Sequence, residues 1–167
     1  MPLETETVMR QLAPADLDDI NAVIEAAVMS WDKAERVRRL ALVSCQYGPQ
    51  DFDHLTFFAA TRKAGGVVGV VSWEVADTAS LPEPLRALSI HGLYVHPGMH
   101  GRGVGTRLFE QAVAVARRDG FNGLLVRAMR DAQGFFARQG MRALPVVDPA
   151  RDYPHRFWLD LGDEGQR

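Results

Sequence analysis

The first third of the chain carries two stretches in which apolar residues recur at helical spacing. A short mixed run at 6–12 predicts an edge strand, and the apolar positions over 17–28 then predict a helix, with Asp16 as its N-cap. A second helix is predicted at about 32–46, and its arginines are expected to face solvent. One side of this second helix is formed by Val37, Leu40, Val43 and Ser44.

From residue 55 the pattern changes to short runs rich in β-branched and aromatic residues. The runs 55–61 and 67–75 flank a polar turn and predict a hairpin, and 87–95 predicts a further strand. A helix is expected directly after the glycine-rich turn that follows residue 95. A strand at 124–127, a helix at 132–139 and a last strand at 156–161 complete the order.

This order of elements predicts an α/β protein of the α+β type. The hairpins favour antiparallel pairing, whereas the strand–helix–strand unit over 87–127 predicts a parallel crossover. We therefore expect a mixed, mostly antiparallel sheet of six to seven strands with helices on both faces.

Composition and charge narrow the class of protein. A length of 167 residues predicts one domain over 1–167. The net charge of −2 gives none of the basic excess that nucleic-acid binding requires, so no nucleic-acid partner is expected. The single Cys45 allows no internal disulfide, and no apolar run is long enough to span a membrane. These features predict a cytoplasmic protein without a membrane partner.

The glycine-rich turn is a candidate anion site. Residues 100–105 read His-Gly-Arg-Gly-Val-Gly and open a helix, whose first amides and dipole favour negative charge. Arg102 and Arg107 can add cationic contacts, so the predicted ligand is a phosphate or pyrophosphate. The spacing matches neither the dinucleotide fingerprint nor the P-loop. The alternative is that these glycines only form a tight strand-to-helix turn.

Two segments resemble signatures of the GNAT (Gcn5-related) N-acetyltransferases. Residues 93–108 resemble the acetyl-CoA loop of that family, and 129–141 resemble its second signature, with Ala132, Phe135 and Gly140 fitting. The resemblance implies a GNAT-like fold and acetyl-CoA as co-substrate, without a metal. In the strand end and loop, the implied cofactor contacts are Leu93, Tyr94, Val95, His100, Gly101, Arg102, Gly103, Val104, Gly105 and Thr106. In the second segment they are Met129, Ala132, Phe135, Phe136 and Arg138.

Three residues depart from the family pattern. His100 replaces the usual Gln or Arg of the loop, and Met129 replaces the usual Asn. Phe136 stands where the family often has the Tyr that protonates the departing thiolate. A phenyl ring cannot donate a proton, so this role is missing or lies elsewhere.

Acetyl transfer to an amine needs few side chains, and four are candidates. His91 is the first candidate base, because regular strand alternation puts it on one face with Ser89, Leu93 and Val95 and because histidine ordinarily titrates near neutral pH. A structural histidine is the alternative. Ser89 and Glu74 are further candidates for the base, and Glu74 can equally be an exposed strand carboxylate. Tyr94 is a candidate acid, although core packing is favoured for it.

The sequence therefore predicts an acetyl-CoA-dependent N-acetyltransferase that transfers the acetyl group directly to an amine of a small molecule or protein. The alternatives are a non-catalytic acyl-CoA-binding or sensing module and a nucleotide-phosphate binder. The proline-flanked segment with Tyr153 and His155 either overhangs the site or is a plain connection. The identity of the amine acceptor stays open, and so does the choice between a monomer and a homodimer.

Overall fold

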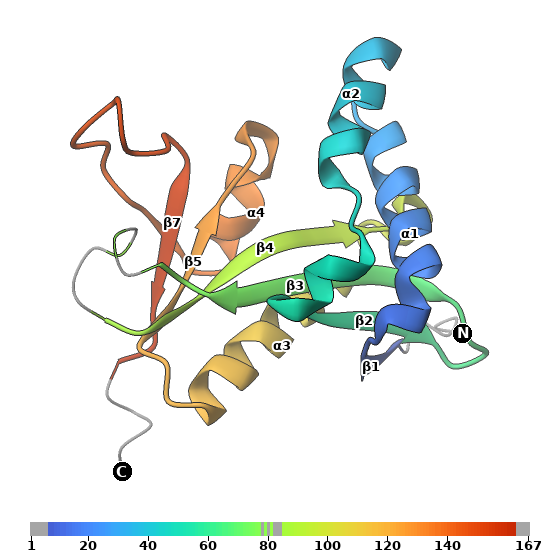
Figure 1. Ribbon diagram of the computed structural model, residues 1–167, viewed down its shortest axis with the longest axis horizontal. Helices are drawn as coiled ribbons and strands as arrows, with labels where there is room; N and C mark the ends of the chain where they lie inside the picture. Colours follow the sequence, from blue (N-terminus) through green and yellow to red (C-terminus); the bar gives the residue numbers. More distant parts are fainter. Residues whose placement is uncertain (1–6, 78, 80, 82–84, 163–167) are drawn as a thin grey trace. The chain divides into compact units, whose positions relative to one another are not determined.

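The computed structural model describes residues 7–77, 79, 81 and 85–162, and it contains strands and helices in the expected alternation (Figure 1). The strands are β1 (Thr7–Gln11), β2 (Thr56–Arg62), β3 (Val67–Val75), β4 (Ala87–Val95), β5 (Gly123–Arg127), β6 (Arg142–Ala143) and β7 (Arg156–Asp160). The α-helices are α1 (Leu17–Met29), α2 (Glu35–Cys45), α3 (Val104–Arg118) and α4 (Gln133–Arg138). None of the helices in the described ranges is long and apolar enough to cross a membrane.

The strands form one seven-stranded sheet in the order β1-β2-β3-β4-β5-β7-β6. β1 pairs antiparallel with β2, and β7 pairs antiparallel with both β5 and β6. β4 and β5 run parallel, joined by the crossover through α3. The predicted mixed sheet with a parallel crossover is therefore confirmed, while the two-residue β6 was not predicted.

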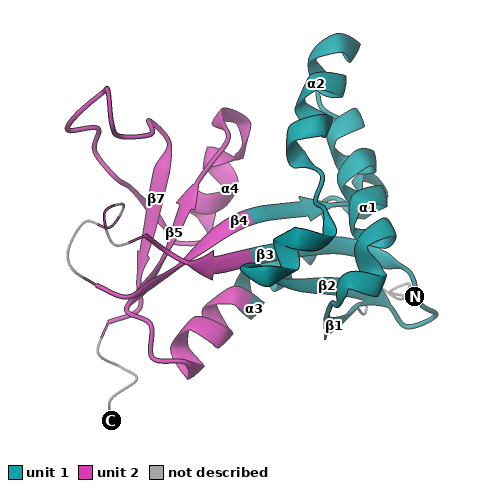
Figure 2. Ribbon diagram, in the orientation of Figure 1, with its two compact units in different colours: residues 1–72, 92–111 teal, residues 73–91, 112–167 magenta. Residues whose placement is uncertain are grey.

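The chain divides into two compact units, and β3, β4 and α3 each contribute residues to both (Figure 2). Unit 1 comprises Met1–Ser72 and Gly92–Gln111, and unit 2 comprises Trp73–His91 and Ala112–Arg167. The single domain expected over 1–167 stays a prediction.

The core of unit 1 lies between α1 and the strands β2 and β3. The buried face of α1, formed by Ile20, Val23, Ile24 and Val28, packs in one cluster with Phe57 of β2 and Val70 of β3. The neighbouring Gly69 instead faces α3: a Cβ there would stand 2.8 Å from Leu108 Cδ1 and 3.0 Å from Val104 Cγ1. Since successive residues of a strand point to opposite faces, unit 1 carries helices on both faces of β3, as predicted.

Tyr47 joins several elements of unit 1 at one point. The Asn21 side chain of α1 bonds to both backbone groups of Tyr47, donating to its carbonyl and accepting from its N–H, each at 2.9 Å. The Tyr47 ring packs edge-on against Phe57 with centroids 4.9 Å apart. Its hydroxyl lies 2.9 Å from the buried Ser72 Oγ of β3. A residue between two elements thus fixes a helix against two strands.

The core of unit 2 lies along β5 and β7. Leu125 of β5 is in register with Trp158 of β7, and both are buried in a cluster with Ala87 of β4. β5 begins at a glycine for steric reasons, because a Cβ on Gly123 would stand 2.4 Å from Trp158 Cζ2 and 2.5 Å from the Leu159 carbonyl oxygen.

The start of α1 differs from its predicted cap. Asp16 is the N-cap residue, but its carboxylate makes no cap bond to the helix. The carboxylate instead accepts the Ala13 N–H at 2.8 Å and pairs with Arg10 at 3.2 Å. The Ala13 N–H is the main cause of the lowered pKa of Asp16, with Arg10 adding to it. The residue thus stabilises the turn before the helix.

The apolar side of α2 faces away from the core. Val37, Leu40 and Val43 are 50%, 63% and 78% exposed, and the helix packs on the core through Ala41, Leu42 and Cys45. Its arginines were expected to face solvent, and this is wrong for Arg38, which is half-buried and whose Nη1 donates to the Met29 carbonyl at the end of α1. An arginine of α2 thus satisfies one of the carbonyls that the end of a helix leaves open.

We expect two alanine substitutions in α2 to show that the helix packs on the core through Leu42 and not through Leu40. Leu42→Ala should lower the free energy of unfolding by about 2 kcal/mol, because it leaves a cavity against the core. Leu40→Ala, the matched control, should change it by less than about 0.5 kcal/mol, because that side chain is already largely in water. Urea unfolding of both variants measures the difference, and the reverse order would contradict the packing of α2 on the core through Leu42.

Candidate active site

β4 changes its surroundings halfway along its length. Its parallel register with β5 runs from Ala87–Gly123 to Ile90–Val126, and β4 then continues to Val95. Residues 87–90 are mostly buried, whereas 91–95 are partly or fully exposed. The second half of β4 therefore offers backbone groups on the side that its first half uses for β5, and a strand edge of this kind can pair with an extended ligand.

An extra residue in β4 accompanies this change. The Ala76 N–H donates to the Ala87 carbonyl at one end, and the His96 N–H donates to the Val68 carbonyl at the other, at 2.9 and 2.8 Å. Between these two bonds the chain advances nine residues along β4, from Ala87 to His96, but only eight along β3, from Val68 to Ala76. Ser72 and Gly92 already lie opposite each other, so the extra residue falls between Ala87 and Gly92. Such a β-bulge bends a strand and ends its regular pairing.

The bulge also fixes which backbone groups face away from β3. The His96 N–H donates to β3, and the Tyr94 carbonyl oxygen lies beside Gly69 of β3. Alternation along the strand then directs the N–H and C=O groups of Leu93 and Val95 to the opposite side. The Val95 carbonyl accepts a bond from His100 Nε2 at 3.1 Å. His100, which departs from the family pattern, thus closes the loop back onto the strand.

The loop after β4 is held by its own short-range bonds. His96 Nδ1 accepts the Gly98 N–H at 3.0 Å, and the His100 N–H donates to the Pro97 carbonyl at 3.3 Å. The His100 amide, one of the predicted ligand contacts, is therefore engaged within the loop. The amides that can meet a ligand begin at Gly101.

Two glycines of the loop adopt a conformation that other residues avoid. Gly101 and Gly103 have φ of 74° and 78°, and neither has an atom within 4 Å of where a Cβ would stand. They are required by the backbone angle rather than by crowding, and open space lies above them. α3 follows, and its first helical bond runs from the Arg107 N–H to the Gly103 carbonyl at 3.0 Å. The amides before it point out of the helix end.

Both arginines predicted as cationic contacts of this loop are exposed. The Arg107 side chain donates to the Thr7 hydroxyl of β1, so it ties α3 to the edge strand. Arg102 lies between the two positive-φ glycines. The loop thus combines helix-start amides with two exposed guanidinium groups, of which Arg107 already has a partner in β1.

Two hydroxyl groups lie close to the backbone of β4 at Gly92. A Cβ on Gly92 would stand 2.5 Å from the Tyr47 hydroxyl, 2.8 Å from Tyr94 Cε2 and 3.5 Å from Ser72 Oγ. The buried hydroxyl pair of Tyr47 and Ser72 therefore needs a glycine above it. Nothing in the sequence marked Tyr47 or Ser72, and Gly92 was read only as part of a strand.

Tyr94 packs inside unit 1, as the core-packing alternative expected. Its ring lies against the cluster that contains Tyr47 and Cys45. Burial is the main cause of its strongly raised pKa, and a hydrogen bond with the Cys45 thiol adds to it. A phenol with a raised pKa is a weaker proton donor, which does not favour the role of acid for Tyr94.

Ser89, His91 and Glu74 all belong to unit 2. Ser89 is half-buried in register with Leu125, and His91 is exposed directly after the last β4–β5 pair. Glu74 of β3 is half-buried. The expectation that Ser89, His91, Leu93 and Val95 share one face of β4 stays a prediction. His91 remains a candidate through its place at the end of the β5 pairing.

The second predicted segment, Met129–Arg138, lies in unit 2. It begins with a short turn in which the Ala132 N–H donates to the Met129 carbonyl at 2.9 Å, and α4 follows. Phe136 is only 5% exposed, with its ring 5.1 Å from Phe135 and 6.5 Å from Phe157 of β7. Arg138 is exposed in the last turn of α4.

A strand edge leads here into a glycine turn at the start of a helix, an arrangement that can bind an extended, phosphate-bearing ligand. The model of the acetyltransferase (GNAT) family matches residues 21–141, which include parts of both units. The chain belongs to this family. None of the curated proteins matches the sequence.

Solved structures share the fold at low sequence identity. A GCN5-related N-acetyltransferase from Rhodopseudomonas palustris is 24% identical, with 96% of this chain and 99% of that chain covered and a TM-score of 0.70. PaiA N-acetyltransferase from Thermoplasma acidophilum, in complex with coenzyme A, is 12% identical, with 93% of this chain and 99% of that chain covered and a TM-score of 0.71. A GNAT family acetyltransferase from Brucella melitensis, in complex with acetyl-CoA, is 19% identical, with 94% of this chain and 89% of that chain covered and a TM-score of 0.64. The GNAT-like fold predicted from the two signatures is confirmed.

Over the ranges that the structure describes, His, Cys, Asp and Glu side chains form no group of three or more that could hold a metal ion.

We expect Gly92→Ala to disturb β4 and to be partly rescued by a second substitution. The added methyl group would meet the Tyr47 hydroxyl, so unfolding should become easier by about 1–3 kcal/mol. Tyr47→Phe removes that hydroxyl, so the double variant should recover part of the loss. Thermal and urea unfolding of the wild type, both single variants and the double variant form the cycle. Fully additive losses would show that Gly92 and the hydroxyl do not contact each other.

Proposed function

We propose that this protein is an N-acetyltransferase that transfers the acetyl group of acetyl-CoA directly to an amine of a small molecule or protein. The observation that carries the proposal is the continuous path from the bulged end of β4, through two positive-φ glycines, to the start of α3. Direct transfer is favoured because Cys45, the one cysteine of the sequence, is half-buried and bonded to Tyr94.

The pyrophosphate of acetyl-CoA would lie at the amides of Gly101–Thr106, where the helix dipole and Arg102 add positive potential. The pantetheine arm would pair with the outward side of β4. There the N–H and C=O of Leu93 and the N–H of Val95 would meet the arm, since the Val95 carbonyl accepts from His100. Met129, Ala132, Phe135, Phe136 and Arg138 would contact the cofactor from their own segment, as the family resemblance implies.

The chemistry then requires a neutral amine. Its nitrogen attacks the thioester carbon, the C–S bond breaks, and the sulfur leaves as a thiolate with the electron pair. A backbone N–H near Val95 would stabilise the oxyanion. The amine's proton passes to a base, for which His91 is the first candidate, with Glu74 and Ser89 as alternatives. Phe136 has no hydroxyl, and a thiolate can leave without an acid because thiols ionise at about 8.5.

The buried Phe136 also favours a second candidate, a non-catalytic acyl-CoA-binding or sensing module. Transfer to an amine separates the two. For either candidate we propose a cytoplasmic protein without a resident metal, a nucleic-acid partner or a membrane partner, either monomeric or homodimeric.

Acetyl-CoA binding should depend on the loop rather than on backbone strain in general. Gly103→Ala should weaken binding at least about 10-fold, because Ala disfavours a φ of 78° and the loop would rearrange. The control is Gly65→Ala, which imposes a similar strain at φ 92° in the β2–β3 turn and should leave affinity unchanged. Isothermal titration measures both. No binding of acetyl-CoA by the wild type would overturn the proposed function.

We expect His91→Ala to lower kcat/KM about 100-fold at neutral pH and to flatten its pH profile, because a base that accepts the amine proton is lost. Ser89→Ala and Glu74→Gln should cost much less. The assay is thiol release with a broad panel of amines. A pH profile that stays unchanged in His91→Ala would remove this residue from the mechanism, and release that is absent for every amine despite tight binding would favour the sensing module.

A further inference from the structure

Ala128 is the residue between the end of β5 and Met129, and both of its backbone groups are bonded to the segment that precedes β7. Its N–H donates to the His155 carbonyl at 2.8 Å, and its carbonyl accepts the Tyr153 hydroxyl at 3.2 Å. Ala128 is buried, whereas the ring of Tyr153 is partly exposed. A tyrosine side chain therefore reaches across to hold the point at which the chain leaves β5.

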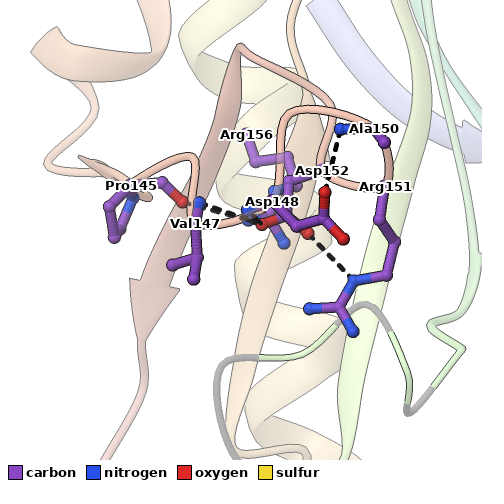
Figure 3. A network of polar contacts seen from close by, with 7 residues as sticks. All are labelled: Pro145, Val147, Asp148, Ala150, Arg151, Asp152 and Arg156. Carbon is purple, nitrogen blue, oxygen red and sulfur yellow. Dashed lines mark hydrogen bonds and ion pairs between the residues drawn. The ribbon is translucent and has the colours of Figure 1, made fainter.

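Tyr153 belongs to a loop organised around one carboxylate, which we call the Asp152 loop, residues 145–156. Figure 3 shows the polar contacts of this carboxylate. The Asp152 side chain is only 7% exposed. Its Oδ2 accepts the N–H groups of Val147 and Asp148, each at 3.1 Å. Its Oδ1 accepts from Arg151 Nε at 3.4 Å, and Arg156 Nη2 lies 3.6 Å from Oδ2.

The Asp152 loop is closed by bonds within itself. The Asp152 N–H donates to the Asp148 carbonyl at 2.7 Å, and Arg156 Nη2 donates to the Pro145 carbonyl at 3.2 Å, which joins the two ends of the loop. The Asp148 N–H is the main cause of the lowered pKa of Asp152, with the Val147 N–H and Arg151 adding to it. A charged, buried acceptor of this kind fixes the loop in one conformation, and Tyr153 is the residue that comes directly after it.

We propose that Tyr153 is a positioning residue for Met129–Arg138, acting through the Ala128 carbonyl, and that the Asp152 loop holds its hydroxyl in place. The inference rests on the proposed function, which gives Met129–Arg138 a role in contacting acetyl-CoA. It makes the segment before β7 a support for the cofactor site rather than a plain connection.

The Tyr153–Ala128 bond can influence Met129–Arg138 because this segment is short and begins directly after Ala128. Met129 begins the turn that the Ala132 N–H closes, and α4 starts at the next residue. At its far end the segment is fixed by Phe136, which packs on Phe157 of β7. The Tyr153 bond sets the near end, so its loss would free Met129 and Ala132 while leaving Phe136 in its place.

Tyr153→Phe tests the proposal by removing the hydroxyl and keeping the ring. In the free protein, amide hydrogen exchange over residues 128–132 should become about 3- to 10-fold faster, the range expected for one lost hydrogen bond. The Kd and KM for acetyl-CoA should rise by a similar factor while kcat changes little. A merely structural role would lower overall stability without this local exchange signature or the split between KM and kcat.

The matched control is Val147→Ser, because Val147 is exposed and contributes only its backbone N–H to Asp152. It should leave exchange and KM unchanged. Asp152→Asn should act in the same direction as Tyr153→Phe and add little to it in the double variant, because both act through one bond. If Asp152→Asn does not fold, Tyr153→Phe alone decides.

The outcomes separate this inference from the proposed function. If the wild type binds acetyl-CoA while Tyr153→Phe shows unchanged exchange and unchanged affinity, the positioning role is wrong and the function stands. If the wild type binds no acetyl-CoA, the proposed function fails, and with it any role of Tyr153 in cofactor binding. Fully additive effects of Asp152→Asn and Tyr153→Phe would overturn the link between the loop and the hydroxyl.

Discussion

The extra residue in β4 is the constraint on which the candidate site depends. A regular strand would have continued its parallel register with β5 and kept its backbone groups in the sheet. The bulge lies between Ala87 and Gly92, where the β5 register ends, and beyond it the strand is partly exposed. At its end the Tyr47–Ser72 hydroxyl pair occupies the space that Gly92 leaves on one face. A local irregularity of β4 thus accompanies the open strand edge.

Most of the fold could be predicted from the sequence because its signals are local. Alternation and turn residues marked the hairpin β2–β3, and the helical repeat marked α1 and α3. The failures share a cause. The exposure of the apolar side of α2 could not be predicted, because the pattern on one helix does not say which side meets the core. Arg38 was expected in solvent, and its contact with the end of α1 depends on how the two helices pack. The short β6 is defined by its pairing with β7, and a run of two residues is too short to carry a strand pattern in the sequence.

The site divides in the same way. The glycine loop and its helix were visible because backbone angles demand particular residues there, and Gly101 and Gly103 do adopt positive φ. The bulge was invisible because it is defined by counting residues against a partner strand. Tyr47 and Ser72 were missed because their meaning comes from a contact between distant parts of the chain. Tyr153 was noticed, but its bond to Ala128 could not be inferred from sequence spacing.

The His100–Val95 bond has a consequence for what the edge of β4 can recognise. Because His100 already occupies one of the two lone pairs of the Val95 carbonyl, the outward side of Leu93–Val95 offers more donor than acceptor capacity. A ligand that matches this polarity must bring more carbonyl oxygens than N–H groups to the strand. An arm of the same length with its amides reversed would face donors with donors, and each mismatch would leave a polar group without compensation for its lost water. The histidine of the loop thereby gives the strand edge a direction.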